Sequence, residues 1–349
     1  MPQPPEPLAA TNDVTVWPAI SPARLREVAD RLDAAETAMG SPLVDEAERA
    51  RLDRAVRGEL APGEQGWQPA LAWSRDRVVG YLAVVTEGDD ASGDAAVLTA
   101  VADDGPAASL DDTAADHAGV EIHDVEVLGA LLEGAQGLAA QAGSSALQVW
   151  TRRGGQPQIE AAHQAGFTIA RRLGVLGRPL EPASPPPPAP AATIREVRPG
   201  LDDVDVVEVL AEAYAGTDEA GWDAATFAER TRLAWYRPED LLVAERDTAA
   251  GGPRLGGLHW LKRRDETTGE VYNLAVHPAA QGEGLGPTLL HAGLTHLREQ
   301  GLDEVILWVD LANERAVRLY HAQGFETRWL DLALSRVVGE GNRSSGGPA

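Results

Sequence analysis

Cysteine is absent from the 349 residues of this chain, and lysine occurs only once, as Lys262. Without cysteine the chain cannot form disulfides, thiolate metal sites or a cysteine nucleophile. No apolar run reaches the roughly 20 residues needed to cross a bilayer. The first residues, Met1-Pro-Gln-Pro-Pro-Glu-Pro, lack the basic and apolar regions of a secretory signal, so we expect a cytoplasmic protein.

Positive charge is also scarce. The chain has 30 lysines and arginines against 54 aspartates and glutamates, a formal net charge of −24. This balance opposes binding to nucleic acid or to an anionic membrane, and we expect neither as a partner. It opposes any polyanionic ligand as well. A phosphate site in this chain would therefore need backbone N–H groups and arginines placed locally.

The segment from Glu270 to Gly286, EVYNLAVHPAAQGEGLG, is the most informative part of the chain. It predicts a strand from Val271 to Val276, a glycine-rich turn and a helix from about Pro287, where the missing proline N–H costs nothing. A glycine turn that opens a helix directs unpaired N–H groups and the positive end of the helix dipole at one point. The segment therefore predicts a phosphate-binding site.

A second pattern follows this turn. It consists of an apolar strand from Val305 to Val309, then Asn313, a helix from Glu314 to Gln323 that carries Tyr320, and Gly324-Phe325. This order, together with the spacing Gln-x-x-Gly-x-Gly, resembles the GNAT superfamily of N-acetyltransferases. The resemblance implies an α/β fold with a mixed, mostly antiparallel sheet flanked by helices. It also implies acetyl-CoA as the acetyl donor, no metal, and small-molecule substrates; we expect a monomer.

The chain is divided by a proline-rich segment, residues 181–192, that predicts an extended linker. One constant offset in number aligns the two halves: Trp150 falls on Trp308, and His163 to Phe167 fall on His321 to Phe325. This register indicates an internal duplication. We therefore predict two tandem GNAT-like domains, at 1–180 and 193–336, and a disordered tail at 337–349.

The first half has lost the residues that make the second half chemically interesting. His123 to Leu128 replace the turn from Gln281 to Gly286, and they include two carboxylates, Asp124 and Glu126. At a helix N-terminus these carboxylates would repel a pyrophosphate. Ala162 replaces Tyr320 and Gly155 replaces Asn313. We predict a structural first repeat and a catalytic second repeat.

Two side chains of the second half could carry acid–base chemistry. Glu270 begins its strand, and with period-two alternation it would share a face with Tyr272, Leu274 and Val276. Its carboxylate could accept a proton from an amine, or it could be a solvated strand-end glutamate. The phenol of Tyr320 could protonate a departing thiolate, or the ring could be a core aromatic.

The second half also resembles the mycothiol synthase family of actinobacteria. The resemblance lies in Gly257 to Lys262, residues 269–286, Gly221-Trp222 and Asn313 to Phe325. It implies transfer of acetyl from acetyl-CoA to the cysteine amine of an amino-sugar conjugate, desacetylmycothiol (Cys-GlcN-Ins), giving mycothiol and CoA. Glu270 would be the general base and Tyr320 the general acid.

The same resemblance assigns residues to the two substrates. The implied contacts to the acetyl acceptor are Asp45 (with Glu46 a close second), Asp218, Lys262, Glu270 and Trp308. The implied contacts to acetyl-CoA are Leu274, Ala275, Val276, Gln281, Gly282, Glu283, Gly284, Leu285, Gly286, Pro287, Asn313, Glu314, Arg315 and Arg318. Arg315 and Arg318 could equally be solvated helix charges, and Asp45 and Asp218 could be ordinary surface acids.

The sequence departs from the family pattern at two points. Gly282 and Glu283 stand where the phosphate turn usually carries arginine, which removes a cation and adds an anion. Trp308 stands where the family commonly has tyrosine, which removes a hydroxyl. Two alternatives therefore stay open: acetyl transfer to another small-molecule or protein amine, or a CoA-sensing module without turnover.

Overall fold

A computed structural model describes residues 6–11, 13–19, 21–39, 42–75, 77–98, 118–180, 192–217, 220–247 and 253–338. The predicted linker (apart from Ala192) and the tail from residue 339 lie outside these ranges. The described chain forms two compact units. The first contains the residues up to Leu173 and those from Trp329 onward, and the second contains Gly174–Arg328.

The first unit is built on a mixed sheet with the strand order β1-β2-β3-β4-β5-β6-β13. Only the β5–β6 pair is parallel among the pairings β1–β2, β2–β3, β3–β4, β4–β5, β5–β6 and β6–β13. The bounds are β1 (Ala9–Ala10), β2 (Thr15–Pro18), β3 (Trp67–Ser74), β4 (Arg77–Glu87), β5 (Asp90–Val97), β6 (Ala146–Gly154) and β13 (Glu326–Val337).

Helices cover both faces of this sheet. On one face α3 (Ala118–Gln141) and α4 (Gln156–Gln164) pack against alternate residues of the strands, such as Leu82 and Val84 of β4. On the other face α1 (Pro22–Met39) and α2 (Glu46–Val56) pack against Tyr81 and Val85. The period-two alternation of a central strand therefore serves two apolar cores.

Helix α3 corrects the expectation for Asp124 and Glu126. The helix begins at Ala118, so both residues lie inside it rather than at its N-terminus. Glu126 accepts a hydrogen bond from the Thr11 hydroxyl at 2.7 Å. The segment that aligns with the glycine turn of the second repeat is therefore helical, which removes the turn as well as its glycines.

The second unit contains a sheet with the strand order β7-β12-β11-β10-β9-β8. The β11–β12 pair is parallel, and β8–β9, β9–β10 and β10–β11 are antiparallel. The bounds are β7 (Thr168–Pro179), β8 (Thr193–Glu196), β9 (Leu241–Asp247), β10 (Pro253–Arg263), β11 (Thr268–Val276) and β12 (Glu304–Asp310), with short 3₁₀ turns η2 (Pro238–Asp240) and η3 (Pro278–Ala280). In the first unit a 3₁₀ turn, η1 (Glu64–Gly66), precedes β3.

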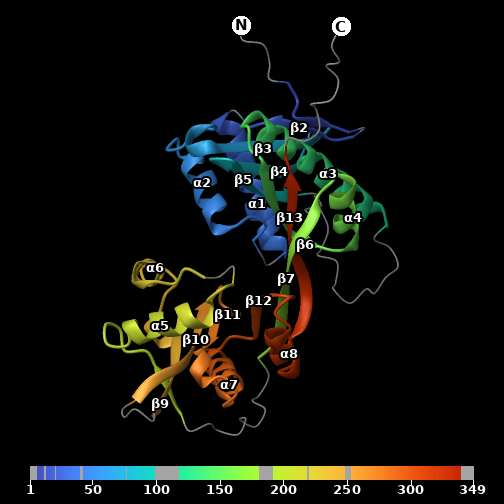
Figure 1. Ribbon diagram of the computed structural model, residues 1–349. Coiled ribbons are helices and arrows are strands. Elements are labelled where there is room, and N and C mark those ends of the chain that lie inside the picture. The colour runs from blue at the N-terminus through green and yellow to red at the C-terminus, as the bar shows by residue number, and fades with distance from the viewer. Residues whose placement is uncertain are drawn as a thin grey trace, which may run out of the picture. The chain divides into compact units, whose positions relative to one another are not determined.

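Helices of the second unit lie on opposite faces of its sheet (Figure 1). On one face α5 (Asp203–Ala213) and α6 (Ala224–Arg230) pack against Trp260 and Leu258. On the other, α7 (Leu285–Glu299) and α8 (Glu314–Ala322) pack against Leu261 and Val271. The two units share one order of elements, strand–strand–helix–strand–helix–strand, and this confirms the predicted tandem repeat with mixed, mostly antiparallel sheets.

Two strands belong to both compact units. Strand β7 starts in the first unit and continues into the second from Gly174, whereas β13 starts in the second and belongs to the first from Trp329. From Leu330 onward β13 pairs with β6 of the first unit. The compact units therefore differ from the predicted domain limits at both strands. The end of β7, the last strand of the first repeat, belongs to the second unit, and the end of β13, the last strand of the second repeat, belongs to the first unit.

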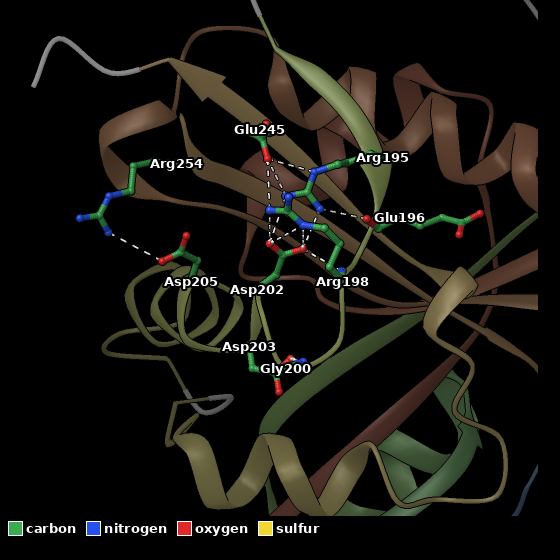
Figure 2. Close-up of polar contacts among 9 residues, drawn as sticks. All are labelled: Arg195, Glu196, Arg198, Gly200, Asp202, Asp203, Asp205, Glu245 and Arg254. Atoms are coloured by element: carbon green, nitrogen blue, oxygen red, sulfur yellow. Dashed lines mark hydrogen bonds and ion pairs between the residues drawn. The ribbon is translucent and has the colours of Figure 1, made fainter. Parts of the chain in front are cut away.

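The edge of the second sheet is fixed by a cluster of charges around Asp202 (Figure 2). Asp202, which is 3 % exposed, accepts hydrogen bonds at 2.7 Å from Arg195 and from both the backbone N–H and the guanidinium of Arg198. Arg195 also donates to Glu245 of β9 at 2.6 Å. Burial alone would raise the pKa of Asp202, but the two arginines lower it well below its usual value. The cluster ties the edge strand β8 and the start of α5 to β9.

Candidate active site

The central feature of the second unit is the separation of two parallel strands. Parallel pairing joins Thr268–Val271 of β11 to Glu304–Leu307 of β12, and both strands run on beyond it. A cleft of about 400 Å³ lies at the diverging ends, and its walls include the Leu274–Val276 segment. The separation exposes a strand edge to the cleft, onto which an extended ligand can add by backbone hydrogen bonds.

The glycine turn forms the mouth of this cleft. Gly282 and Gly284 have φ values of 85° and 84°, a left-handed conformation that favours glycine. Gly284 is the N-cap of α7 and supplies no side-chain cap, so the first N–H groups of the helix are open to a ligand. The helix begins at Leu285, which makes Pro287 its third residue and not its first as predicted. The turn residues that line the cleft are Gln281, Gly282, Gly284, Leu285, Gly286 and Pro287.

Arginines approach the turn from two sides. Arg315 of α8 donates to the side-chain oxygen of Gln281, whose amide in turn donates to the Val276 carbonyl at 3.2 Å. From β9, Arg246 forms an ion pair with Glu283. Glu283 was predicted to contact acetyl-CoA, but it does not line the cleft. Its charge is instead balanced by Arg246, so the added anion does not leave the turn with a net negative charge.

Helix α8 supplies the opposite wall. Asn313 caps this helix, with its side-chain oxygen accepting from the Ala316 N–H at 3.1 Å, and both residues line the cleft together with Arg315. Glu314 and Arg318 pair with each other at 2.9 Å, with 79 % and 70 % of their side chains exposed. These two residues do not line the cleft.

Tyr320 lies about two helical turns after the Asn313 cap and also lines the cleft. Only 7 % of the residue is exposed, and its ring packs edge-on against Phe325 with centroids 5.6 Å apart. The side chain is therefore part of the core and part of the cleft wall at once. A phenol held in this way has a fixed position from which it can donate a proton.

A β-bulge in β11 corrects the prediction of a single face for Glu270, Tyr272, Leu274 and Val276. Trp260 of β10 pairs with Asn273 and Leu261 with Val271, so Tyr272 is an extra residue. Tyr272 packs with the aromatic residues on the α5 side, whereas Leu274 and Val276 pack toward α7. The bulge breaks the alternation, so the prediction was wrong for Leu274 and Val276.

The α5 side of the sheet carries the charged residues that the sequence assigned to the acetyl acceptor. Lys262 and Glu270 are direct cross-strand partners in the β10–β11 ladder. The Lys262 ammonium lies 5.0 Å from the centre of the Trp235 ring and 5.9 Å from that of Tyr272. Glu270 is 7 % exposed and accepts a hydrogen bond from Arg264 at 2.9 Å.

Trp308 joins the same group. The Arg264 guanidinium lies 5.1 Å from the centre of the Trp308 ring, within cation–π range. Sequence reasoning missed Arg264, although its position two residues after Lys262 places it on the same side of the hairpin. It also missed Arg246, for which no local pattern exists because its partner is far along the chain.

The remaining two predicted acceptor contacts are Asp218 and Asp45. Asp218 is outside the described residues. Asp45 is exposed in the first unit and caps α2, where its carboxylate accepts from the Glu48 N–H at 2.6 Å. Glu46 is also exposed. The capping role explains Asp45 without a ligand, and its predicted contact with substrate stays a prediction.

Helix α7 rests on a buried histidine. His259 of β10 is fully buried, and its Nδ1 lies 2.8 Å from the Leu289 carbonyl of α7. Burial lowers the pKa of His259 to about 4, so the ring is neutral at physiological pH. A Cβ at Gly293 would lie 2.1 Å from the same nitrogen. Glycine at this position therefore lets the helix that carries the phosphate turn pack directly on the ring.

Among the described residues, no group of three or more potential metal ligands lies together. None of the helices in the ranges given above is both long and apolar enough to cross a membrane.

Comparison with known proteins places this site in a family. The family model described as "Acetyltransferase (GNAT) family" matches residues 207–325, which include the strand separation, the glycine turn and Tyr320. Among solved structures, a tandem GNAT protein from the clavulanic acid biosynthesis pathway has a TM-score of 0.56 and 17 % identity, with coverage of 94 % of this chain and 99 % of that chain. At this identity the likeness shows the fold.

Sequence relatives narrow the family further. The mycothiol acetyltransferase of Stackebrandtia nassauensis is 39 % identical over 212 residues, which cover 59 % of this chain and 67 % of that protein. The mycothiol acetyltransferase of Streptomyces avermitilis is 34 % identical over 336 residues, which cover 92 % of this chain and 98 % of that protein. Since the second alignment spans both proteins almost entirely, the chain belongs to the mycothiol acetyltransferase family of GNAT acyltransferases.

Proposed function

We propose that this enzyme transfers the acetyl group of acetyl-CoA to the cysteine amine of desacetylmycothiol, giving mycothiol and CoA. The observation that carries the proposal is the cleft in the second unit. It combines diverging strands, an uncapped glycine turn at the start of α7 and a buried tyrosine. These are the parts needed to hold a thioester with a long arm and a diphosphate.

In this proposal the diphosphate lies on the backbone N–H groups of the glycine turn and the first turn of α7. Arg315 lines the cleft and would be the cation that meets the phosphates. The pantetheine arm adds along Leu274–Val276, and a backbone N–H of this segment polarises the thioester carbonyl. The apolar side chains of the cleft exclude water from the arm.

The chemical step needs one proton acceptor and one donor. The amine nitrogen attacks the thioester carbon, a C–N bond forms and the C–S bond breaks. Glu270 takes the proton that leaves the amine, directly or through water, and Tyr320 protonates the departing thiolate. Lys262 and the Glu270 carboxylate on the α5 side suit an acceptor that carries many hydroxyls and one amine.

A turnover assay tests the proposal. The purified enzyme is mixed with acetyl-CoA and desacetylmycothiol, and released CoA is followed. We expect rapid release with this amine and slow release with a panel of other amines. Fast turnover of a different amine would move the enzyme to another substrate. Acetyl-CoA binding without turnover for any amine would instead support a sensing role.

The tyrosine can be tested by a single change. Tyr320→Phe keeps the ring against Phe325 and removes only the hydroxyl. We expect kcat to fall by roughly 100-fold, the usual contribution of one acid–base group. The dissociation constant of acetyl-CoA, measured by calorimetry, should change by less than about threefold. A loss of binding as large as the loss of kcat would assign Tyr320 a structural role.

A further inference from the structure

Arg264, Glu270 and Trp308 form a three-part contact on the α5 side of the second unit. The Arg264 Nη1 donates to the Glu270 Oε2 at 2.9 Å, and the guanidinium carbon lies 5.1 Å from the centre of the Trp308 ring. The side chains of Arg264 and Glu270 are 20 % and 10 % exposed. This ion pair is therefore largely shielded from water. Because of this shielding, its attraction is stronger than that of a pair on the surface.

The hairpin between β10 and β11 fixes where Arg264 stands. Its backbone N–H donates to the Thr268 carbonyl at 2.9 Å, which closes the turn. Inside the turn, the Asp265 carboxylate accepts from the backbone N–H groups of Thr267 and Thr268, both at 2.8 Å. Burial alone would raise the pKa of Asp265, but these hydrogen bonds lower it. The arginine therefore leaves a rigid turn and needs little further ordering to reach Glu270.

The tryptophan ring completes the support. A guanidinium is planar, stacks on aromatic faces and keeps its in-plane N–H groups free to donate at its edge. Trp308 can therefore hold Arg264 from one face while Nη1 holds Glu270. Tyrosine at this position would offer a smaller ring.

We infer that Arg264 is the positioning residue for Glu270, and that Trp308 holds Arg264 in place. The inference rests on the proposed function, in which Glu270 accepts the amine proton. Arg264 fixes the carboxylate through Oε2 and leaves proton acceptance to Oε1. Proton transfer requires the two heavy atoms within hydrogen-bond reach, so a carboxylate that rotates freely loses rate without losing either substrate.

The test is a double-mutant cycle on kcat with the full-length enzyme. We expect Arg264→Gln to lower kcat by about 10- to 100-fold, the range typical for loss of a group that orients an active-site residue. Glu270→Gln should lower kcat further. In the double variant Arg264→Gln/Glu270→Gln, kcat should equal that of Glu270→Gln alone. If the two losses multiply instead, Arg264 does not act through Glu270 and the inference is wrong.

Two further variants separate positioning from folding. Arg264→Lys can still donate to Oε2 and should recover part of the lost kcat, whereas a fold defect would not be rescued. The neighbouring Arg263 pairs with Asp240 at 2.8 Å and is the matched control. Arg263→Gln should lower the midpoint temperature of unfolding. The factor by which it lowers kcat should be no smaller in the presence of Glu270→Gln than in the otherwise unaltered enzyme. Equal behaviour of the Arg263 and Arg264 variants in this background would overturn the inference.

The cycle also distinguishes failure of the inference from failure of the proposed function. If Glu270→Gln keeps the kcat of the unaltered enzyme, Glu270 is not the base, and both statements fall. If Glu270→Gln is inactive and Arg264→Gln is fully active, only the positioning role falls. In every variant, the dissociation constant of acetyl-CoA reports whether the cleft remains intact, because Arg263, Arg264 and Glu270 do not line it.

Discussion

Replacement of His259 by leucine should make the second unit more resistant to acid. His259 is fully buried below α7, and among the described residues its Nε2 has no hydrogen-bond partner. The other nitrogen faces the Leu289 carbonyl. In the unfolded chain the same ring is solvated and takes up a proton readily. Protonation therefore favours unfolding, and leucine removes this linkage.

The size of the effect follows from the two pKa values. Burial lowers the pKa of His259 from 6.5 to about 4. Because the folded value is the lower one, the unfolded chain binds more protons between these limits, and stability is lost as the pH falls from 6.5 to about 4. The total loss is about 3 kcal/mol, at about 1.4 kcal/mol for each pH unit. Above pH 6.5 this contribution is fully present.

Leucine should cost little at neutral pH. The Leu289 carbonyl lies within α7 and keeps the N–H of residue 293 as its helical partner. Removal of the imidazole also removes the partnerless Nε2, whose burial costs about 1–3 kcal/mol. We therefore expect His259→Leu to lie within about 1 kcal/mol of the unaltered protein at pH 7.5, since cores tolerate replacements of similar volume.

Urea unfolding at several pH values between 7.5 and 4.5, followed by tryptophan fluorescence, measures the difference between variant and unaltered protein. Acidic groups that titrate in the same range cancel in this difference. The gap in the free energy of unfolding should grow in favour of His259→Leu by about 2–3 kcal/mol as the pH falls. A gap that stays constant from pH 7.5 to 4.5 would refute the role assigned to the buried ring.

Two other predictions concern charge. Glu283→Gln should tighten acetyl-CoA binding and Arg246→Gln should weaken it, each by about fivefold at low salt, because one unit charge at roughly 8 Å and a dielectric constant of about 40 is worth about 1 kcal/mol. The double variant should return near the original affinity, as isothermal titration would show. Weaker binding by Glu283→Gln, or tighter binding by Arg246→Gln, would refute this account of the two charges. In the first unit, burial and the nearby Asp45 carboxylate raise the pKa of Asp94 to about 7. The folded state is thus destabilised by up to about 4 kcal/mol as the pH rises from 3.8 to 7. Asp94→Asn should abolish this dependence of the free energy of unfolding on pH, measured by chemical unfolding. An unchanged pH dependence would count against the role assigned to Asp94.

Local patterns in the sequence predicted the parts of the site that are built locally. The strand, the glycine turn and the helix after it are contiguous, and glycine is required where φ is positive at Gly282 and Gly284. The helical position of Tyr320 also agrees with the helix predicted from Glu314 to Gln323. The constant offset between the two halves predicted the tandem repeat, and the resemblance to the GNAT superfamily implied the mixed sheets.

Contacts between distant segments could not be predicted in this way. The pairing of Arg246 with Glu283 depends on how β9 lies beside the turn, and no pattern marks it. The alternation rule failed at Tyr272 because a bulge inserts one residue without a sequence signal strong enough to predict it. The start of α3 at Ala118 was missed for a different reason. Alignment to the second repeat assumed that the turn had kept its shape after its glycines were lost.

In the proposed function, the bulge at Tyr272 allows one strand to contact both substrates. Before the bulge, Glu270 faces the α5 side, where Lys262 and Arg264 gather. After the bulge, Leu274 and Val276 turn toward α7 and its glycine turn. Without the extra residue, strict alternation would place all of these side chains on one side, and the carboxylate would share a face with the apolar residues that line the cleft. In the proposed function, this single inserted residue lets a short strand present a polar face to the acceptor and an apolar edge to the acetyl donor.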